Sequence, residues 1–363
     1  MKIKNLSLKN FTAFEQAKFN FCDGINVLIG TNGTGKTHAM KAIYAVLNSL
    51  KTANMLSNDL EKLFNIHNSN ELIRNNNNTR KATTFFSHKN GRLEFSLGIS
   101  DGIINPDSTI DYKSEIDIEV NINNSETVNF VYLPTVEMLS IYDHFFATYE
   151  RKEIPYDSTC YDLALALNAA TLRNTHADYQ SVEPILKHLQ EIITDSKSQE
   201  QDVVVKESEH FYFNLNGNKL DVNLVADGYR KLGTLFYLLR NGSLTTNSIL
   251  FWDEPEANLN PKLIVKVAKV LQALADSGMQ IFIATHDYLL SHELSLLAEY
   301  PSENPTKVKF FSLHKPNHDS SVMTQEGDSL ADISHNPILE EFADYYDREV
   351  ELFSNEDSSN DTH

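Results

Sequence analysis

Residues 25–47 read INVLIGTNGTGKTHAMKAIYAVL, and this stretch decides the fold class of the chain. INVLIG is typical of a short buried strand, and THAMKAIYAVLNSL then takes up the periodicity of a helix with one apolar side. Between them, residues 30–37 match the pattern G-x-x-x-x-G-K-[ST] in full. A chance match in a polar loop is the alternative, and the strand-loop-helix context argues against it. The sequence therefore predicts a phosphate-binding loop.

The residue types in this loop suit the binding of a nucleoside triphosphate. Glycines let the backbone curl so that successive N–H groups point at phosphate oxygens. Lys36 brings a positive charge to the β- and γ-phosphates, Thr37 offers a hydroxyl group to Mg²⁺, and the following helix adds its positive dipole end. The predicted nucleotide-binding residues of this segment are Gly30, Asn32, Gly33, Thr34, Gly35, Lys36, Thr37 and His38.

A second buried strand, in SILFWDEPEANLNPKL, runs into two acidic residues. Asp253 is expected at the carboxyl end of this strand beside the loop, where it can hold Mg²⁺ through water. Glu254 is expected to point to the opposite face, where it can polarise an attacking water molecule. The alternative is that both carboxylates only cap the strand. A kinase or a simple switch GTPase does not need the second carboxylate, so the pair favours a hydrolase.

A third buried strand, in QIFIATHDY, ends at His286. A histidine at this position can hydrogen-bond the γ-phosphate and sense its loss. Alone, it is more often an ordinary residue at a strand end. Its order after the phosphate loop and the acidic strand favours the sensing role.

Composition limits the other classes of function. The 363 residues include 31 Lys and Arg against 50 Asp and Glu, a formal charge of −19, which argues against a protein coated by nucleic acid. A small basic face around Lys51, Lys81, Lys89 and Arg92 is the exception, with an ordinary solvated surface as the alternative. The two cysteines cannot build a thiolate zinc site. Without a membrane-length apolar run or a signal peptide, we expect a cytoplasmic protein with no membrane partner.

Alternation of strands with helices around the glycine loop and the acidic strand predicts an α/β sheet. Residues 1–25 predict two short strands joined by a turn, and residues 83–99 a hairpin that turns at Asn90-Gly91. Residues 54–80 are polar, and NNNNTRK at 75–81 predicts a loop, whereas residues 137–196 predict helices. Strands are further expected at EIDIEVNIN, TVNFVYLP, DVVVKES, HFYFNLNG, KVKFFSLHK and SSVMTQEG, and helices at YRKLGTLFYLLRNG and PKLIVKVAKVLQALADSG.

The C-terminal segment predicts a helix around ILEEFADYYDREVELF, followed by an acidic, disordered tail. Ile338, Phe342, Tyr345 and Val350 lie on one side of this helix, which we expect to dock on the sheet. The residues after 314 are too few for a nuclease domain. No cluster of metal-ligating residues suggests a second catalytic centre.

The order of glycine loop, ADGYRKLG, FWDEPEANLNP and IFIATH resembles that of ABC-type ATPase heads. These include the SMC and RecF proteins and the OLD-like "AAA" ATPases of bacterial anti-phage defence systems. The opening KIKNLSLKNFTAFEQAKFNFCDGINVLIGTNGTGKT, with its N-F-x-x-F element, is especially similar to theirs. VYLPTVEMLS and the helices after it resemble the stand-alone defence ATPases more than transporters. The resemblance covers roughly residues 1–50 and 222–315.

The resemblance implies a role for each matching residue. Lys36 and Thr37 bind the triphosphate and Mg²⁺ of ATP, and Asp253 is a Mg²⁺ ligand. Glu254 is the hydrolytic base and His286 the switch histidine. ADGYR corresponds to the signature segment, whose Asp227, Gly228 and Arg230 contact the nucleotide of the opposite subunit. EANLN, which ends at Asn260, corresponds to the D-loop at the dimer interface.

Three positions depart from the family pattern. The serine of the signature segment is replaced by Ala226, and the basic residue of the N-F-[RK]-x-F opening by Thr12. The usual Q-loop glutamine has no clear counterpart: Glu137 is either its equivalent or a plain glutamate at a helix N-terminus. Slow ATP hydrolysis would be consistent with these changes.

The resemblance implies an ABC-like P-loop head with N-terminal antiparallel strands and an inserted hairpin and helical subdomain. We expect the core at residues 1–53 and 200–335, the insertion at 54–199, and the C-terminal helix and tail at 336–363. Two subunits would sandwich two ATP molecules. The chain would then act as a sensor or scaffold in a defence system that controls a separate effector, with a nuclease as the favoured kind. The alternative is a RecF-like repair ATPase that binds DNA directly, and a transporter ATPase is the weaker third hypothesis.

Overall fold

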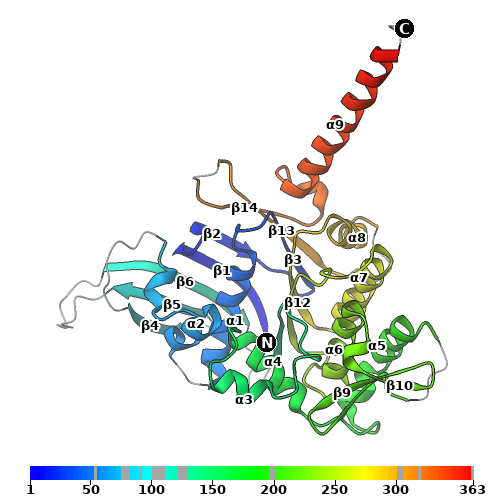
Figure 1. Ribbon diagram of the computed structural model, residues 1–363. Coiled ribbons are helices and arrows are strands. Elements are labelled where there is room, and N and C mark those ends of the chain that lie inside the picture. Colours follow the sequence, from blue (N-terminus) through cyan, green and yellow to red (C-terminus); the bar gives the residue numbers. More distant parts are fainter. Residues whose placement is uncertain are drawn as a thin grey trace.

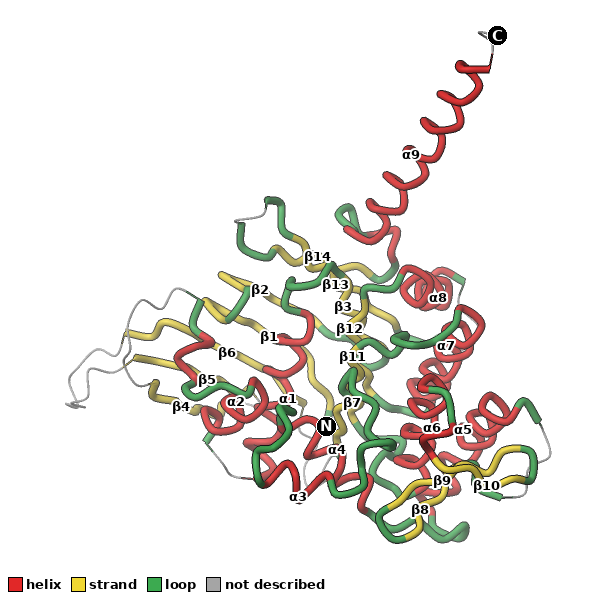
Figure 2. Tube along the Cα trace, in the orientation of Figure 1, coloured by secondary structure: helices red, strands yellow, loops and turns green. Residues whose placement is uncertain are grey.

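The computed structural model of the chain describes residues 1–52, 55–74, 82–89, 92–99, 111–121, 129–196, 201–300, 306–317 and 320–360. A mostly parallel sheet lies at its centre (Figures 1 and 2). Every neighbouring pair in it is parallel except the first, which is antiparallel. In spatial order its described strands are β14 (Met323–Gly327), β13 (Val308–His314), β3 (Ile25–Ile29), β12 (Gln280–Thr285), β11 (Ile249–Asp253) and β7 (Phe130–Leu133). The prediction of an α/β P-loop fold is confirmed.

An antiparallel sheet lies beside the central one (Figure 1). The predicted hairpin is confirmed, because Lys89 pairs with Arg92 at its turn end. The turn itself, at Asn90 and Gly91, lies outside the described residues. The strand order of this sheet is β2 (Phe14–Asn20), β1 (Lys2–Phe11), β6 (Asp111–Asn121), β5 (Arg92–Ile99) and β4 (Ala82–Lys89). The hairpin thus extends the sheet that the N-terminal strands begin.

Helices cover the central sheet, and its strands supply apolar residues to both faces because successive side chains point to opposite sides. Val27 and Ile29 belong to the core shared with one helical layer, whereas Leu28 faces the core between α1, β1 and β2. The helices of the first layer are α4 (Ser158–Asn168), α5 (Ala177–Thr194), α6 (Asp227–Arg240), α7 (Pro261–Asp276) and α8 (Tyr288–Glu299), and α1 (Lys36–Thr52) lies in the second.

The remaining elements are short. A small antiparallel sheet orders as β10 (Asn218–Asp221), β9 (His210–Leu215) and β8 (Val204–Glu207). Helix α3 (Phe145–Glu150) precedes α4, and short 3₁₀ turns occupy Ser69–Leu72, Val222–Leu224 and Leu330–Asp332. Of the described helices, none combines the length and apolar character needed to cross a bilayer.

Two helices of the connecting segments were not predicted from the sequence, and the loop predicted at residues 75–81 lies outside the described residues. Residues 54–80 contain helix α2 (Leu56–Phe64), whose buried Leu56, Leu60 and Leu63 form a narrow apolar stripe among polar residues. The segment after the switch strand forms α8, which the sequence reading did not include. In both cases the helix is stabilised by packing of one face on the body, which average polarity does not reveal.

The C-terminal helix α9 (Pro337–Asn360) corrects two further predictions. It does not dock on the sheet: Ile338 is buried, but Phe342, Tyr345 and Val350 are 51%, 56% and 46% exposed, and the helix projects from the body (Figure 1). Both faces of the central sheet are already covered by other elements, so no apolar surface is left for it. The segment predicted as a disordered tail is helical as far as Asn360.

The proposed division into domains meets one complication in the strand order. Strand β7 lies within residues 54–199, which we predicted as an insertion, yet it pairs with β11 at the edge of the central sheet. Strands β4 to β6, from the same segment, extend the N-terminal sheet. The boundaries given above stay a prediction.

Candidate nucleotide-binding site

The phosphate loop joins β3 to α1 and takes its shape from three glycines. Gly30, Gly33 and Gly35 all have positive φ, which side chains other than glycine's rarely adopt. A Cβ atom on Gly35 would lie 2.8 Å from the ring of Phe14, so the loop backbone rests directly on the N-F-x-x-F element. A Cβ on Gly33 would meet nothing within 4 Å, so this side of the loop is open to an approaching ligand.

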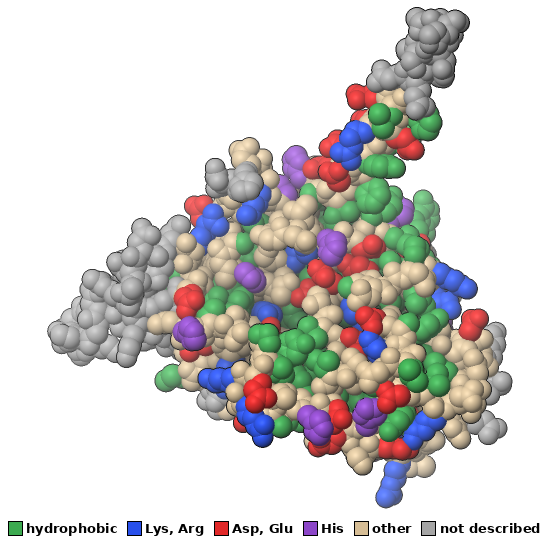
Figure 3. All heavy atoms as spheres, viewed as in Figure 1, with side chains coloured by type: hydrophobic (Ala, Val, Ile, Leu, Met, Phe, Trp, Pro, Cys, Tyr) green, Lys and Arg blue, Asp and Glu red, His purple; other side chains and the backbone are tan. Residues whose placement is uncertain are grey.

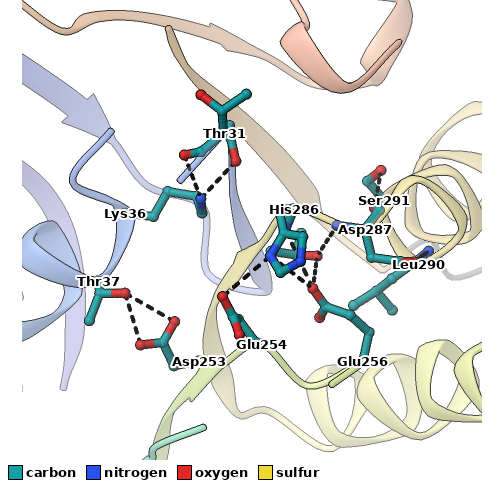
Figure 4. Close-up of polar contacts among 12 residues, drawn as sticks. Thr31, Lys36, Thr37, Asp253, Glu254, Glu256, His286, Asp287, Leu290 and Ser291 are labelled. Atoms are coloured by element: carbon teal, nitrogen blue, oxygen red, sulfur yellow. Dashed lines mark hydrogen bonds and ion pairs between the residues drawn. The ribbon is translucent and has the colours of Figure 1, made fainter. Parts of the chain in front are cut away.

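Lys36 is held at the start of α1 by the loop itself. Its Nζ donates hydrogen bonds to the carbonyl oxygens of Gly30 and Thr31, at 2.7 and 3.0 Å (Figure 4). The side chain is 7% exposed, and burial lowers its pKa, while the charges of Asp253 and Glu254 act in the opposite direction. The ammonium group is therefore placed over the loop before any ligand arrives.

Thr37 and Asp253 join the loop to the acidic strand. Thr37 Oγ1 donates to Asp253 Oδ2 at 2.9 Å, although the two residues are far apart in sequence. Tyr132, at the end of β7, donates its hydroxyl to the same carboxylate oxygen at 3.3 Å. Burial raises the pKa of Asp253, and the hydrogen bond from Thr37 opposes that shift. This hydroxyl and carboxylate are hard oxygen ligands of the kind that Mg²⁺ prefers, so the residues present fit the predicted metal.

Glu254 and His286 face each other across the strand ends. Glu254 Oε1 lies 3.3 Å from His286 Nδ1 (Figure 4), and its backbone N–H donates to the carbonyl of Ala284 at 2.9 Å. Glu254 has a left-handed φ of 48°, which is uncommon for a side chain other than glycine or asparagine. Such strained residues cluster at active sites, where the surroundings impose the conformation.

Three buried side chains of the site were not found from the sequence. Glu256 Oε1 accepts a hydrogen bond from Thr285 Oγ1 at 2.7 Å and lies 3.4 Å from the backbone nitrogen of His286. Burial raises the pKa of Glu256. Lys231, from α6, donates to the carbonyl of Glu254 at 3.2 Å. The third is Tyr132. Glu256 could have been noticed as the next acidic residue of DEPE, whereas Lys231 and Tyr132 carry no signal of their role.

The signature segment lies at the start of α6, and its side chains find partners within their own chain. Arg230 forms ion pairs with Asp227 and, at 3.0 Å, with Glu137 Oε2. A Cβ on Gly228 would lie 2.7 Å from Leu259, so this glycine packs under the predicted D-loop. Asn260 ends that loop by capping α7. Contacts of Asp227, Gly228 and Arg230 with a second subunit's nucleotide stay a prediction.

Glu137 does not stand at a helix N-terminus, and its equivalence to the Q-loop glutamine stays a prediction. Besides Arg230, it accepts hydrogen bonds from the backbone N–H groups of Leu139 and Ser140, at 2.6 and 3.1 Å. These residues form a turn, and α3 begins only at Phe145. Glu137 therefore ties the segment after β7 to the signature helix.

His38 turns its side chain toward α2, because its ring packs edge-on against Phe64 with centroids 5.1 Å apart. Burial lowers the pKa of His38 to about 4. Its backbone N–H, in the first turn of α1, is the group that can serve a phosphate.

The low pKa of His38 predicts a pH-dependent stability. His38 binds a proton near pH 6.5 in the unfolded chain and only near pH 4 in the folded chain. Its contribution to the free energy of unfolding is therefore fully present above pH 6.5 and is lost as the pH falls. Between pH 7 and 5 the free energy of unfolding should fall by about 2 kcal/mol more in the wild type than in His38→Gln. Urea unfolding at both pH values measures the difference. The exposed His67→Gln is the control and should follow the wild type.

A cavity of about 380 Å³ opens beside the predicted metal position. The residues that line it come from α1, from the ends of β7 and β11 with the residues that follow them, and from the segment before α4 with the first turn of α4. They are Thr37, Lys41, Tyr132, Pro134, Thr135, Val136, Pro155, Tyr156, Asp157, Thr159, Cys160, Asp253 and Glu254. Lys41 and Asp157 form an ion pair at 2.6 Å on its wall. Glu254 and Asp253 therefore face open space.

A family model described as "AAA domain, putative AbiEii toxin, Type IV TA system" matches residues 25–291. The chain belongs to this AAA family. It is thus a member of a P-loop ATPase family, and the match includes the phosphate loop, the acidic strand and the switch strand described above.

Members of two repair families are similar to parts of this AAA-family chain. The DNA replication and repair protein RecF of Macrococcus caseolyticus is 33% identical over 100 residues, which cover 28% of this chain and 24% of RecF. The DNA double-strand break repair Rad50 ATPase of Archaeoglobus fulgidus is 38% identical over 61 residues, 17% of this chain and 7% of Rad50. The chain spans about a quarter or less of the length of these relatives.

Solved structures of SMC heads resemble the whole AAA-family chain more loosely. The SMC head domain from Thermotoga maritima has a TM-score of 0.45 and 12% identity, covering 90% of this chain and 100% of that one. A structure titled as the SMC head bound to the C-terminal winged-helix domain of ScpA has a TM-score of 0.49 and 13% identity, covering 92% and 100%. These likenesses concern the fold alone.

Proposed function

We propose that the chain is a Mg²⁺-dependent ATP hydrolase that works as a nucleotide-gated dimer. The observation that carries the proposal is the 2.9 Å contact between Thr37 and Asp253, which brings the phosphate loop and the acidic strand to one place. Lys36 and Glu254 lie near this contact (Figure 4). This is the arrangement that a magnesium-bound triphosphate requires.

Each residue has a distinct task in the proposed reaction. The loop N–H groups and Lys36 bind the phosphates, and Thr37 and Asp253 would hold Mg²⁺, which when bound neutralises phosphate charge. Glu254 accepts a proton at Oε1 from the attacking water as the water oxygen bonds the γ-phosphorus and the bond to ADP breaks. His286 orients that carboxylate and contacts the γ-phosphate. Glu256 holds the backbone at His286 in position through Thr285.

The dimer would be closed by the signature segment of each subunit, which covers the nucleotide bound to the other. The surface in front of this segment supports the proposal. Leu224 is 74% exposed immediately before it, and Ala226 is exposed beside Asp227. The exposed leucine lies near a half-exposed carboxylate and the N-terminus of α6. Such a surface is suited to an interface that forms only when ATP is present. Loss of the γ-phosphate on hydrolysis would then loosen the pair.

The dimer is tested by light scattering on Glu254→Gln, which should retain ATP. We expect a dimer with Mg·ATP and a monomer with ADP. Adding Leu224→Asp should reduce the dimer at least tenfold, because it places a charge in the proposed interface. Leu165→Asp, at an exposed position on α4, is the matched control and should leave the dimer unchanged. A monomer under every nucleotide condition would exclude the gated dimer.

We further propose that the dimer controls a separate effector in a bacterial defence system. The proposal rests on the resemblance of VYLPTVEMLS and its following helices to defence ATPases, and the toxin–antitoxin wording of the family description supports it. The second candidate is a RecF-like ATPase that clamps DNA, favoured by the RecF-like segment. Titration of DNA at several salt concentrations separates them: a clamp binds with a steep salt dependence, and the effector-controlling ATPase does not bind.

A further inference from the structure

Helix α9 carries apolar side chains that are largely exposed in the part of the chain that the structure describes. From residue 341 to 353 every side chain is exposed, including Tyr346 at 64% and Phe353 at 64%. Figure 3 shows hydrophobic and acidic side chains side by side along this projecting helix. Its base is anchored by Ile338, which is buried, and by the ring of Phe342 against Tyr288 of α8, with centroids 4.5 Å apart. The helix thus starts on the body and leaves it.

Five apolar residues of α9 have the spacing of a coiled-coil seam. Leu339, Ala343, Tyr346, Val350 and Phe353 follow each other at spacings of four, three, four and three. This spacing places them along one line of a helix, as the a and d positions of a heptad do. A face with this periodicity suits pairing with another helix rather than packing on a sheet.

The positions that flank this seam are acidic. With the seam at a and d, Glu340 and Asp347 take e positions and Glu349 a g position. Arg348, the basic residue of the described side chains of α9, lies at f on the far side, where it pairs with Glu341 at 3.0 Å. Flanking charges determine partner choice in coiled coils, because they meet the e and g residues of the facing helix.

These charges decide between occupants. A second copy of α9 would place two helices with a large excess of Asp and Glu side by side, and an anionic membrane surface would repel the same residues. A partner helix with an apolar seam and with Lys or Arg at its flanks would pack against the seam of α9 and pair with its acidic flanking residues. We propose that α9 is a docking helix for a partner protein, which pairs with it through a helix of apolar seam and basic flanks.

The test uses the full chain and a fluorescent 21-residue helical peptide with Leu and Val at its a and d positions and Lys at e and g. A second peptide has the same seam with Glu at e and g. We expect the Lys-flanked peptide to bind at least tenfold more tightly than the Glu-flanked one by anisotropy, and its affinity to fall as salt is raised.

Two variants separate seam pairing from attraction by charge alone. Tyr346→Asp/Val350→Asp and Arg348→Asp both make the chain two charges more negative, but only the first interrupts the seam. The first should weaken binding of the Lys-flanked peptide at least tenfold, and the second should leave it equal or tighter, with far-UV circular dichroism comparing the helix content of both. Equal binding by the two variants, or no binding to the wild type, overturns the proposal. So does a nucleotide-free dimer that the seam variant abolishes, because that assigns the seam to a second copy.

Discussion

Replacement of Glu254 by Gln is expected to lower ATP turnover by about 10²–10⁴-fold, because an amide cannot accept the proton of the attacking water. Nucleotide binding should persist, since the Lys36 and Thr37 contacts with the loop and with Asp253 do not involve the Glu254 side chain. Phosphate release measures the first effect and calorimetry with Mg·ATP the second.

The exposed Glu153→Gln serves as the matched control for that change of charge and should retain full activity. Turnover by Glu254→Gln within threefold of the wild type would remove Glu254 from the reaction. It would leave the binding site itself untouched, because the loop and Asp253 are tested separately.

Replacement of Lys36 by Ala is expected to weaken Mg·ATP binding by about 10²–10³-fold, or roughly 3–4 kcal/mol. The ammonium group is buried and already oriented by two carbonyl oxygens, so its charge acts on the phosphates with little screening by water. Calorimetric titration gives the affinity, and thermal unfolding shows whether the variant is folded.

The control for Lys36→Ala is Lys187→Ala, which removes a positive charge from the exposed surface of α5. We expect its affinity for Mg·ATP to equal that of the wild type. A folded Lys36→Ala that binds within threefold of the wild type would show that the loop is not a triphosphate site.

The parts of the fold that the sequence predicted are those with local signals. One strong signal is the change from strand to helix at Gly30 to Thr37. The others are the buried runs before Asp253 and His286. Each signal is strong because it depends only on neighbouring residues. The order of the same three segments predicted that they meet. The Thr37–Asp253 hydrogen bond agrees with that expectation.

The parts that were missed depend on contacts between distant segments. Tyr132 and Lys231 reach the site because β7 ends and α6 begins beside β11, and neither residue type is unusual where it stands. The ion pair of Arg230 with Glu137 joins two segments that we interpreted independently. For α9 the sequence showed an apolar face. Such a pattern indicates that the face can pack against something, but it does not identify the partner.

The strand order of the central sheet has a consequence for synthesis of the chain on the ribosome. Strand β3, which positions the phosphate loop, is hydrogen-bonded between β12 and β13, and both are made more than two hundred residues later. During translation the loop therefore emerges long before either neighbour of its strand exists. Pairing that joins such distant segments is slow to form. The apolar INVLI segment stays without either neighbouring strand until residues 280–285 have left the exit tunnel, and a chain that terminates before then has the loop residues but lacks both strands that flank β3.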